Sequence, residues 1–258
     1  MMKKDLRILV LIPSRYGSSR FPGKPLARIG GEEMIIRVCR QVELSGIPMA
    51  VATDDSRIAD CVESHGYKAV MTSSGHRNGT SRIYEAYRKL AAEGNEADVI
   101  INVQGDEPFI HPSQILTLAD IFRNDDKATI ATLCRRFDKE KGFEALFDPN
   151  LVKLTVSGKG EALYFSRSII PYVRGVEWKE WLDKTDFLTH VGIYAYRSDV
   201  LGRLVDLAPS PLEQAESLEQ LRWLENGYRI RVGETDKPTI GIDTPEDLEN
   251  AEKFLQNI

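Results

Sequence analysis

The first half of the chain alternates short apolar runs with amphipathic stretches. Residues 7–12 are apolar at almost every position, which is typical of a strand covered on both faces of a parallel sheet. Further apolar runs lie at 49–52, 68–71, 98–103 and 129–133, and helical patterns lie between them at about 32–45, 55–64, 80–93 and 112–123. This alternation predicts βαβ units, and hence a three-layer α/β/α fold around a mainly parallel sheet.

The pattern changes after Asp148. Runs rich in β-branched and aromatic residues at 152–156, 162–165 and 191–196 predict strands that irregular segments connect. Trp178 and Trp181 lie between the last two runs, where we interpret them as an aromatic contact at a dimer interface rather than plain core.

The last part of the chain predicts one long helix, a short strand and a closing helix. The helix spans about 211–226 and ends at Gly227. The strand covers 240–243, and Pro245 stands at the first position of the closing helix. We therefore expect one doubly wound domain over residues 1–258, with an inserted α+β portion at about 150–235.

The composition excludes several classes of protein. With 258 residues, 42% of them hydrophobic, the chain is long enough for one large α/β domain and too apolar for disorder. Its net charge of −5 argues against non-specific nucleic-acid binding. The longest apolar run, 8–12, is far shorter than the roughly 20 residues of a membrane helix, and the first residues show no signal-peptide pattern. Three widely spaced cysteines favour neither a disulfide framework nor a zinc cluster, so we expect a cytoplasmic protein.

The loop after the first strand carries three cations, Arg15, Arg20 and Lys24. Gly17 and Gly23 would let backbone amides approach an anion closely. Because open α/β sheets bind ligands outside the carboxyl ends of their strands, this loop suits a nucleoside triphosphate. A Walker loop is excluded, since five residues separate Gly17 from Gly23 and no Ser or Thr follows Lys24. The alternative, a basic loop in solvent, does not explain cations placed among glycines and prolines directly after a buried strand.

Two carboxylates follow predicted strands far apart in the sequence. Asp106 comes just after the apolar run 98–103, and Asp243 ends the run near the C-terminus. If both strands belong to one parallel sheet, both side chains face the cationic loop, and a shared Mg²⁺ between carboxylates and phosphates follows. The alternative is that Asp243 only caps the last helix and Asp106 only lies in a turn. We interpret Asp54 and Asp55 as caps of the helix after them.

Together these residues resemble the 3-deoxy-manno-octulosonate cytidylyltransferases, or CMP-Kdo synthetases. The matching segments run in family order over essentially the whole chain, at 12–26, 51–54, 102–108, 162–167, 190–194, 218–222 and 243–248. The resemblance implies a glycosyltransferase-A-like sheet and a cytoplasmic homodimer. It implies that CTP and 3-deoxy-D-manno-octulosonate (Kdo) give CMP-Kdo and pyrophosphate, with Mg²⁺ as cofactor, for lipopolysaccharide synthesis. Neither a nucleic acid nor a membrane is expected as a partner.

The resemblance also implies residue roles. The residues expected to bind the nucleotide are Arg15, Arg20, Lys24, Asn78, Gly79, Thr80, Arg82, Gln104 and Asp106. Those expected around the acidic sugar are Gln104, Arg167, His190, Tyr194, Glu219 and Gln220. The metal ligands would be Asp106 and Asp243, and the catalytic residues would be Arg15, Lys24, Asp106 and Asp243.

The chain departs from the family pattern in three places. Ser14 replaces the usual Ala, which we expect to be harmless. Two departures leave the specificity open: residues 76–82 differ from the usual base-recognition segment at three positions, and Glu213-Gln214 stands where Glu-His is frequent. The alternatives are another nucleotide, 8-amino-Kdo or another acidic sugar, and a non-catalytic nucleotide- or sugar-binding module. The pair Asp106 and Asp243 favours an enzyme, because binding alone needs no shared metal.

Overall fold

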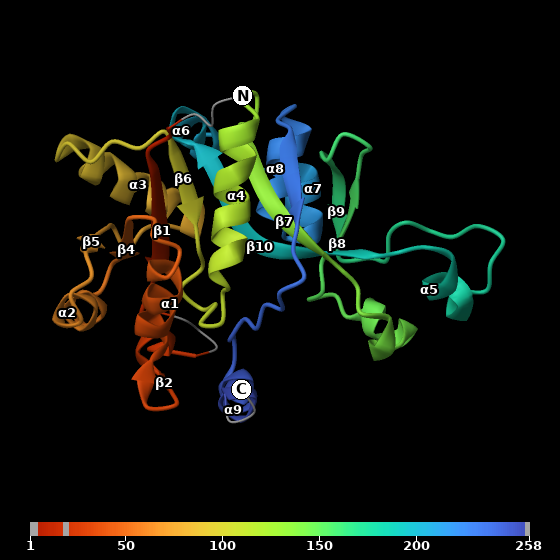
Figure 1. Cartoon of the computed structure of the whole chain (residues 1–258), viewed down its shortest axis with the longest axis horizontal. Coiled ribbons are helices and arrows are strands. Elements are labelled where there is room, and N and C mark those ends of the chain that lie inside the picture. Colours follow the sequence, from red (N-terminus) through yellow and green to blue (C-terminus); the bar gives the residue numbers. More distant parts are fainter. Residues whose placement is uncertain (1–4, 18–20, 256–258) are drawn as a thin grey trace.

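One central sheet organises the molecule, as the computed structural model shows for residues 5–17 and 21–255 (Figure 1). From one edge to the other its strands are β11 (Ile230–Glu234), β7 (Ile130–Arg136), β10 (Leu188–Arg197), β6 (Val99–Asn102), β1 (Ile8–Ser14), β4 (Met49–Thr53) and β5 (Ala69–Met71). The neighbours β6, β1, β4 and β5 pair in parallel, as do β7 and β11. The predicted α/β fold with a mainly parallel sheet is confirmed.

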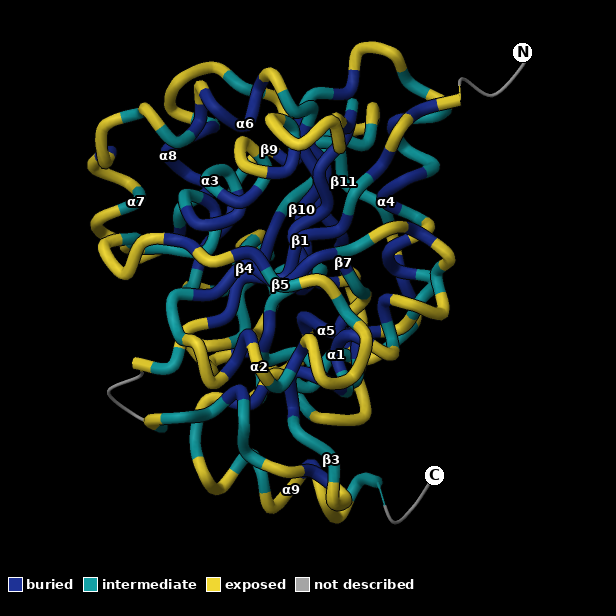
Figure 2. The backbone as a smooth tube through the Cα atoms, turned by 90° about the vertical axis from the view of Figure 1, so that its left-hand side faces the viewer, coloured by how far each residue is buried: buried dark blue, intermediate teal, exposed yellow. Residues whose placement is uncertain are grey.

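Helices cover both faces of this sheet, because its strands are apolar on both sides. In β1, Val10 and Ile12 belong to one apolar cluster and Leu11 to the other, as the alternation of side chains along a strand requires. The first cluster includes α1 (Met34–Glu43), α2 (Ser56–Ser64) and α4 (Pro112–Asn124). The second includes α3 (Gly79–Ala92), α6 (Ser198–Val205) and α8 (Glu219–Glu225). Figure 2 shows the resulting buried centre and exposed periphery.

The segment expected as an insertion contributes to the central sheet itself. Strand β10 lies between β6 and β7 and runs antiparallel to both, and β11 follows at the edge. The hairpin of β8 (Lys153–Val156) and β9 (Ala162–Ser166) extends the sheet from the first residues of β10. The division at 150–235 stays a prediction, but part of that stretch is integral to the sheet.

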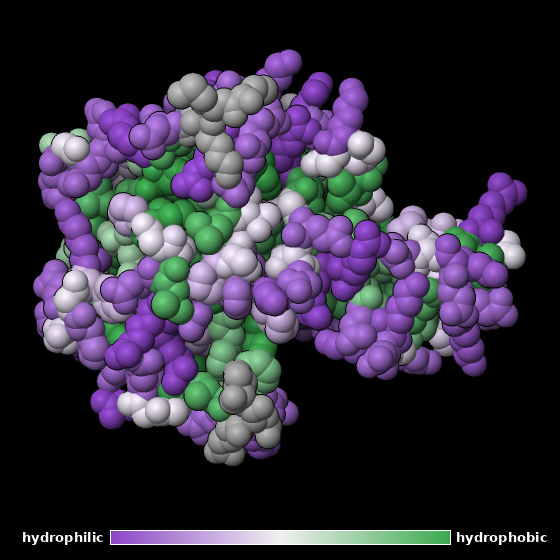
Figure 3. Space-filling model, viewed as in Figure 1, coloured by the Kyte–Doolittle hydropathy of each residue, from purple (hydrophilic) through white to green (hydrophobic). Residues whose placement is uncertain are grey.

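A projecting arm precedes β10 and has its own small core. It contains η2 (Lys139–Lys141), η3 (Phe143–Phe147), η4 (Trp178–Glu180) and α5 (Trp181–Lys184), and it extends to one side of the body (Figure 1). Phe143, Trp181 and Phe187 form the buried centre of this arm. Its apolar side chains are partly visible between polar ones in Figure 3.

The predicted helix 211–226 is wrong in one respect: it is two helices. α7 (Pro211–Glu216) ends at Ser217, whose φ of 50° is left-handed, and α8 begins at Glu219. Hydrogen bonds from the Arg167 side chain to the backbone oxygens of Glu216 (2.6 Å) and Ser217 (3.4 Å) satisfy carbonyls that the break exposes. The apolar periodicity continues across the break and hides it in the sequence.

The predicted strand 240–243 is also wrong. These residues form no strand, and a hydrogen bond from the Ile242 amide to the Asp106 carbonyl (3.0 Å) holds them. The closing helix α9 (Pro245–Leu255) then packs on β2 (Arg28–Ile29), which pairs with β3 (Glu32–Glu33). Among residues 5–17 and 21–255, no helix is long and apolar enough to cross a membrane.

Candidate active site

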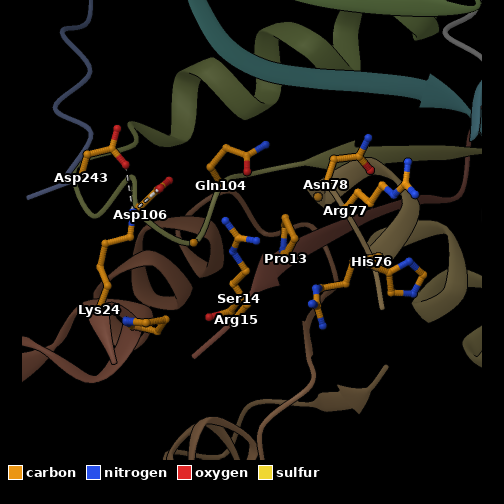
Figure 4. A pocket seen from close by; sticks show the side chains of 14 residues that line it. Pro13, Ser14, Arg15, Lys24, His76, Arg77, Asn78, Gln104, Asp106 and Asp243 are labelled. Atoms are coloured by element: carbon orange, nitrogen blue, oxygen red, sulfur yellow. Dashed lines mark hydrogen bonds and ion pairs between the residues drawn. The ribbon is translucent and has the colours of Figure 1, made fainter. Parts of the chain in front are cut away.

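A cleft of about 290 Å³ lies at the carboxyl ends of β1 and β6. Eight of the predicted site residues line it: Arg15, Lys24, Asn78, Gly79, Arg82, Gln104, Asp106 and Asp243. In Figure 4, Lys24, Asp106 and Asp243 lie together at one end, and His76, Arg77 and Asn78 lie at the other. The first strand, the start of α3 and the loop after β6 therefore meet at one site, as the parallel arrangement predicts.

Gly105 allows the loop after β6 to contact the end of β1 at the base of the cleft. A Cβ atom on Gly105 would lie 2.8 Å from the Pro13 carbonyl oxygen, closer than real side chains come to backbone. The end of β1 and the loop after β6 can thus touch only if residue 105 lacks a side chain. This contact places Gln104 and Asp106 directly beside the loop that carries Arg15.

Lys24 joins the two predicted metal ligands. Its Nζ lies 2.7 Å from Asp106 Oδ2 and 3.2 Å from Asp243 Oδ1. Lys24 begins η1 (Lys24–Leu26) directly after Gly23, whose φ of 72° turns the loop and whose amide donates to the Tyr16 carbonyl at 3.0 Å. Lys24 and Asp243 meet although they are 219 positions apart in the sequence, because the Ile242–Asp106 hydrogen bond brings the end of the chain back to the cleft.

The carboxylate pair fits a divalent metal that arrives with phosphates. Both carboxylates already reach a single positive group, the Lys24 ammonium. Within residues 5–17 and 21–255, no cluster of three or more His, Cys, Asp or Glu side chains forms a metal site on its own. Mg²⁺ commonly takes one or two protein carboxylates and completes its shell with phosphate oxygens and water, so Asp106 and Asp243 match that chemistry.

A third carboxyl group lies beside this pair and was missed in the sequence. Burial first, and then the negative charges of Asp106 and Asp243, raise the pKa of Glu107 to about 8. Its Oε2 is buried without a hydrogen-bond partner. The adjacent acids Asp106-Glu107 after a buried strand were the available signal, but nothing in the sequence shows which of two neighbours points into the cleft.

The other end of the cleft is built on the start of α3. Asn78 caps the helix by accepting a hydrogen bond from the Ser81 amide at 2.9 Å. Arg82, one turn later, is buried and donates to Asp54 at 2.8 Å and to Thr72 at 2.8 Å. The expectation that Asp54-Asp55 supplies the cap of α2 is confirmed for Asp55, whereas Asp54 neutralises Arg82.

Two further residues, His76 and Arg77, line this end of the cleft; they belong to the segment 76–82 that the resemblance links to base recognition, although they were not among the predicted nucleotide-binding residues. His76 Nε2 lies 2.5 Å from Glu85 Oε2. Burial favours the protonated form of Glu85, but hydrogen bonds from Lys89 and His76 outweigh it and lower its pKa to about 2. Their segment follows β5, so the rule that found the first loop would have found them too.

Six predicted residues are not part of the cleft wall. Thr80, Arg167, His190, Tyr194, Glu219 and Gln220 do not line the cleft, and Arg20 falls outside the described residues.

His190 keeps a little exposed area, yet burial of its ring lowers its pKa to about 3, and its Nε2 lies 3.0 Å from the Thr132 hydroxyl. Arg167 donates to the backbone oxygens of Glu216, Ser217 and Pro149, the last at 2.7 Å. Both side chains thus hold internal contacts in this structure.

Comparison with known proteins matches the chain over nearly its full length. Residues 9–230 match the family described as Cytidylyltransferase. The 3-deoxy-manno-octulosonate cytidylyltransferase of Parabacteroides distasonis is 53% identical over 253 residues, covering 98% of this chain and 99% of the relative. That of Bacteroides thetaiotaomicron is 49% identical over 252 residues, with 98% and 99% covered. A solved CMP:2-keto-3-deoxy-manno-octonic acid synthetase in complex with CTP superimposes with a TM-score of 0.88 at 42% identity, covering 97% of this chain and 99% of that one. The chain therefore belongs to the 3-deoxy-manno-octulosonate cytidylyltransferase family.

Proposed function

We propose that this chain transfers CMP from CTP to Kdo, releases pyrophosphate and depends on Mg²⁺. The observation that carries the proposal is the meeting of Lys24, Asp106 and Asp243 at one end of a cleft that also holds Arg15 and the start of α3. A relative of 42% identity and the same fold is known in complex with CTP.

The cleft supports a direct displacement at phosphorus. The anomeric hydroxyl of the sugar attacks the α-phosphorus of CTP in line and loses its proton to water, the bond to the bridging oxygen breaks, and pyrophosphate leaves. Lys24 and Arg15 contribute by attracting the triphosphate and offsetting charge on the departing pyrophosphate. Asp106 and Asp243 would hold the metal, which when bound draws the α-phosphate and the hydroxyl together and acidifies the hydroxyl. No covalent enzyme intermediate is required, so the task of the chain is positioning and electrostatic stabilisation.

We propose that the sugar binds next to the cleft, between Gln104 at its wall and a set of residues outside it: Arg167, His190, Tyr194 and Gln220. Because its pKa is about 3, His190 is neutral at physiological pH and would contact sugar hydroxyls as a hydrogen-bonding group rather than as a cation. Arg167 would then be the positive group of this set, and it would exchange one of its backbone contacts for the sugar carboxylate. The same pocket chemistry would accept 8-amino-Kdo or another acidic sugar.

We propose further that the chain acts as a cytoplasmic homodimer that supplies CMP-Kdo for lipopolysaccharide synthesis, and that the arm makes the dimer contact. Three large apolar side chains of the arm are exposed: Phe147 (59%), Tyr172 (73%) and Trp178 (36%). Aromatic side chains of this kind are enriched in protein interfaces.

A pyrophosphate-release assay tests the function. The purified chain is given Mg²⁺, each of the four nucleoside triphosphates in turn, and Kdo, 8-amino-Kdo or a second acidic sugar. We expect release with CTP and Kdo, and loss of release when EDTA removes the metal. A chain that binds CTP but releases no pyrophosphate with any sugar is a binding module, and that result would refute the proposed function.

A further inference from the structure

Glu219 makes its contacts with the nucleotide side of the site. Its Oε1 accepts a hydrogen bond from Asn78 Nδ2 at 2.7 Å, and its Oε2 accepts one from the Thr80 hydroxyl at 2.7 Å. Asn78 lines the cleft and Thr80 lies in the first turn of α3. These contacts cross 141 and 139 residues of chain, from the start of α8 to the start of α3.

The carboxylate is held in place from its own helix as well. Arg222, buried in α8, donates to Glu219 Oε1 at 2.8 Å and forms a second ion pair with Glu213 at 3.3 Å. Glu213 in turn completes the capping box of α7 together with Ser210. Glu213 thus serves both the fold of α7 and the orientation of Arg222.

The start of α3 needs such a support. Asn78 uses Oδ1 to cap the helix, so its Nδ2 must donate elsewhere, and Glu219 accepts from it. This fixes the plane of the Asn78 amide, because a flipped amide would lose both hydrogen bonds. The fixed Asn78 amide in turn holds the neighbouring Gly79 at the cleft wall.

We propose that Glu219 is a positioning residue for nucleotide binding: through Asn78 and Thr80 it holds the start of α3 in the shape that receives CTP. This inference deepens the proposed function and rests on it, and it assigns Glu219 a role beyond the sugar contact that the resemblance implies. Because α8 also carries Gln220, the link connects the sugar side of the site to the nucleotide side.

The test is a calorimetric titration of each variant with Mg²⁺ and CTP in the absence of any sugar. Glu219→Ala removes the link, and we expect the dissociation constant for CTP to rise about tenfold, within the range of typical coupling between sites. Glu219→Gln should stay close to the wild type, because its amide oxygen can accept from Asn78 while its amide nitrogen donates to the Thr80 hydroxyl. Glu225→Ala, an exposed change in the same helix, is the matched control and should leave the constant unchanged.

A second pair of variants keeps the proposal testable if Glu219→Ala does not fold. Thr80→Val removes one hydroxyl at nearly constant volume, and Thr80→Ser keeps it, so only the first should weaken CTP binding. In a double-mutant cycle, Glu219→Ala and Thr80→Val should be clearly less than additive.

The inference is overturned if folded Glu219→Ala and Thr80→Val both bind CTP as the wild type does, even if the KM for the sugar rises. A wild-type chain that binds no CTP at all overturns the proposed function and the inference with it. Binding of CTP by the wild type without pyrophosphate release would refute only the catalytic proposal, because the titration contains no sugar.

Discussion

The proposed nucleotide side and the proposed sugar side of the molecule hold their residues in different ways. On the nucleotide side, Arg15, Gln104 and Asp106 come directly after β1 and β6, and they line one cleft. On the sugar side, His190 lies within β10 and Glu219 lies at the start of α8, and their side chains contact Thr132, Asn78 and Thr80. The first side is built from loops at strand ends, and the second from residues that belong to a strand or a helix.

This difference shows how far a local pattern determines a site. A loop at a strand end contributes side chains to the ligand without affecting the core, so its residues can all serve the ligand. A residue inside a strand or helix also has to satisfy its neighbours. We therefore expect substitutions on the nucleotide side to affect function with little loss of stability, and substitutions on the sugar side to affect both.

The largest effect is expected from Asp106→Ala. Removing one of the two carboxylates at the proposed metal site should lower kcat/KM for pyrophosphate release by about a thousandfold, the size of effect found when one electrostatic contributor to a transition state is lost. The melting temperature should change little, because Asp106 lies at the cleft surface and its ion pair with Lys24 is partly exposed. Asp60→Asn, an exposed carboxylate change on α2, is the control. Near-normal turnover of Asp106→Ala would remove the metal assignment.

Lys24→Met tests the cation that contacts both proposed metal ligands, Asp106 and Asp243. The variant should bind CTP about a hundredfold more weakly, because a partly buried cation that would meet the phosphates is lost. It should bind Mn²⁺ alone more tightly than the wild type, since Lys24 now occupies the two carboxylates that the metal needs. Calorimetry with CTP and electron paramagnetic resonance of free Mn²⁺ measure the two effects. Unchanged CTP affinity would contradict the role of the cationic loop.

Much of the nucleotide side could be predicted from the sequence, and less of the sugar side. Asp106 and Lys24 were predictable because a buried strand and its loop are both visible as local patterns. Asp243 lies at the cleft as predicted, although the strand expected before it does not form. The backbone hydrogen bond from Ile242 to Asp106 holds this segment beside the cleft instead. The break at Ser217 was not predictable, since the tertiary contact with Arg167 that supports it leaves no local pattern.

Asp54→Asn tests whether the nucleotide side also contains residues that serve the fold. The variant removes the partner of Arg82, whose side chain is only 4% exposed, and leaves a buried charge without compensation. We expect a loss of about 3 kcal/mol in the free energy of unfolding, together with weaker CTP binding, because Arg82 and Thr72 shape the loop before α3. Urea denaturation and CTP titration check both quantities. The exposed change Asp60→Asn should affect neither, and a wild-type stability for Asp54→Asn would show that the pair is dispensable.

The last prediction concerns how His190 makes the free energy of unfolding depend on pH, an effect that is smallest at neutral pH and has a definite sign. Burial holds its pKa at about 3 in the folded protein, against an ordinary value of 6.5, so the unfolded chain binds the proton more tightly. The free energy of unfolding should therefore fall as the pH drops from about 6.5 towards 4, and this fall should be shallower in His190→Gln.

Denaturation at a series of pH values measures the slope, and the ring signals of His190 in an NMR titration should stay constant above about pH 4. Ring signals that titrate near pH 6.5 would mean that the ring is solvated and free to become a cation at the sugar. In that case the sugar side would resemble the nucleotide side, where side chains serve the ligand first.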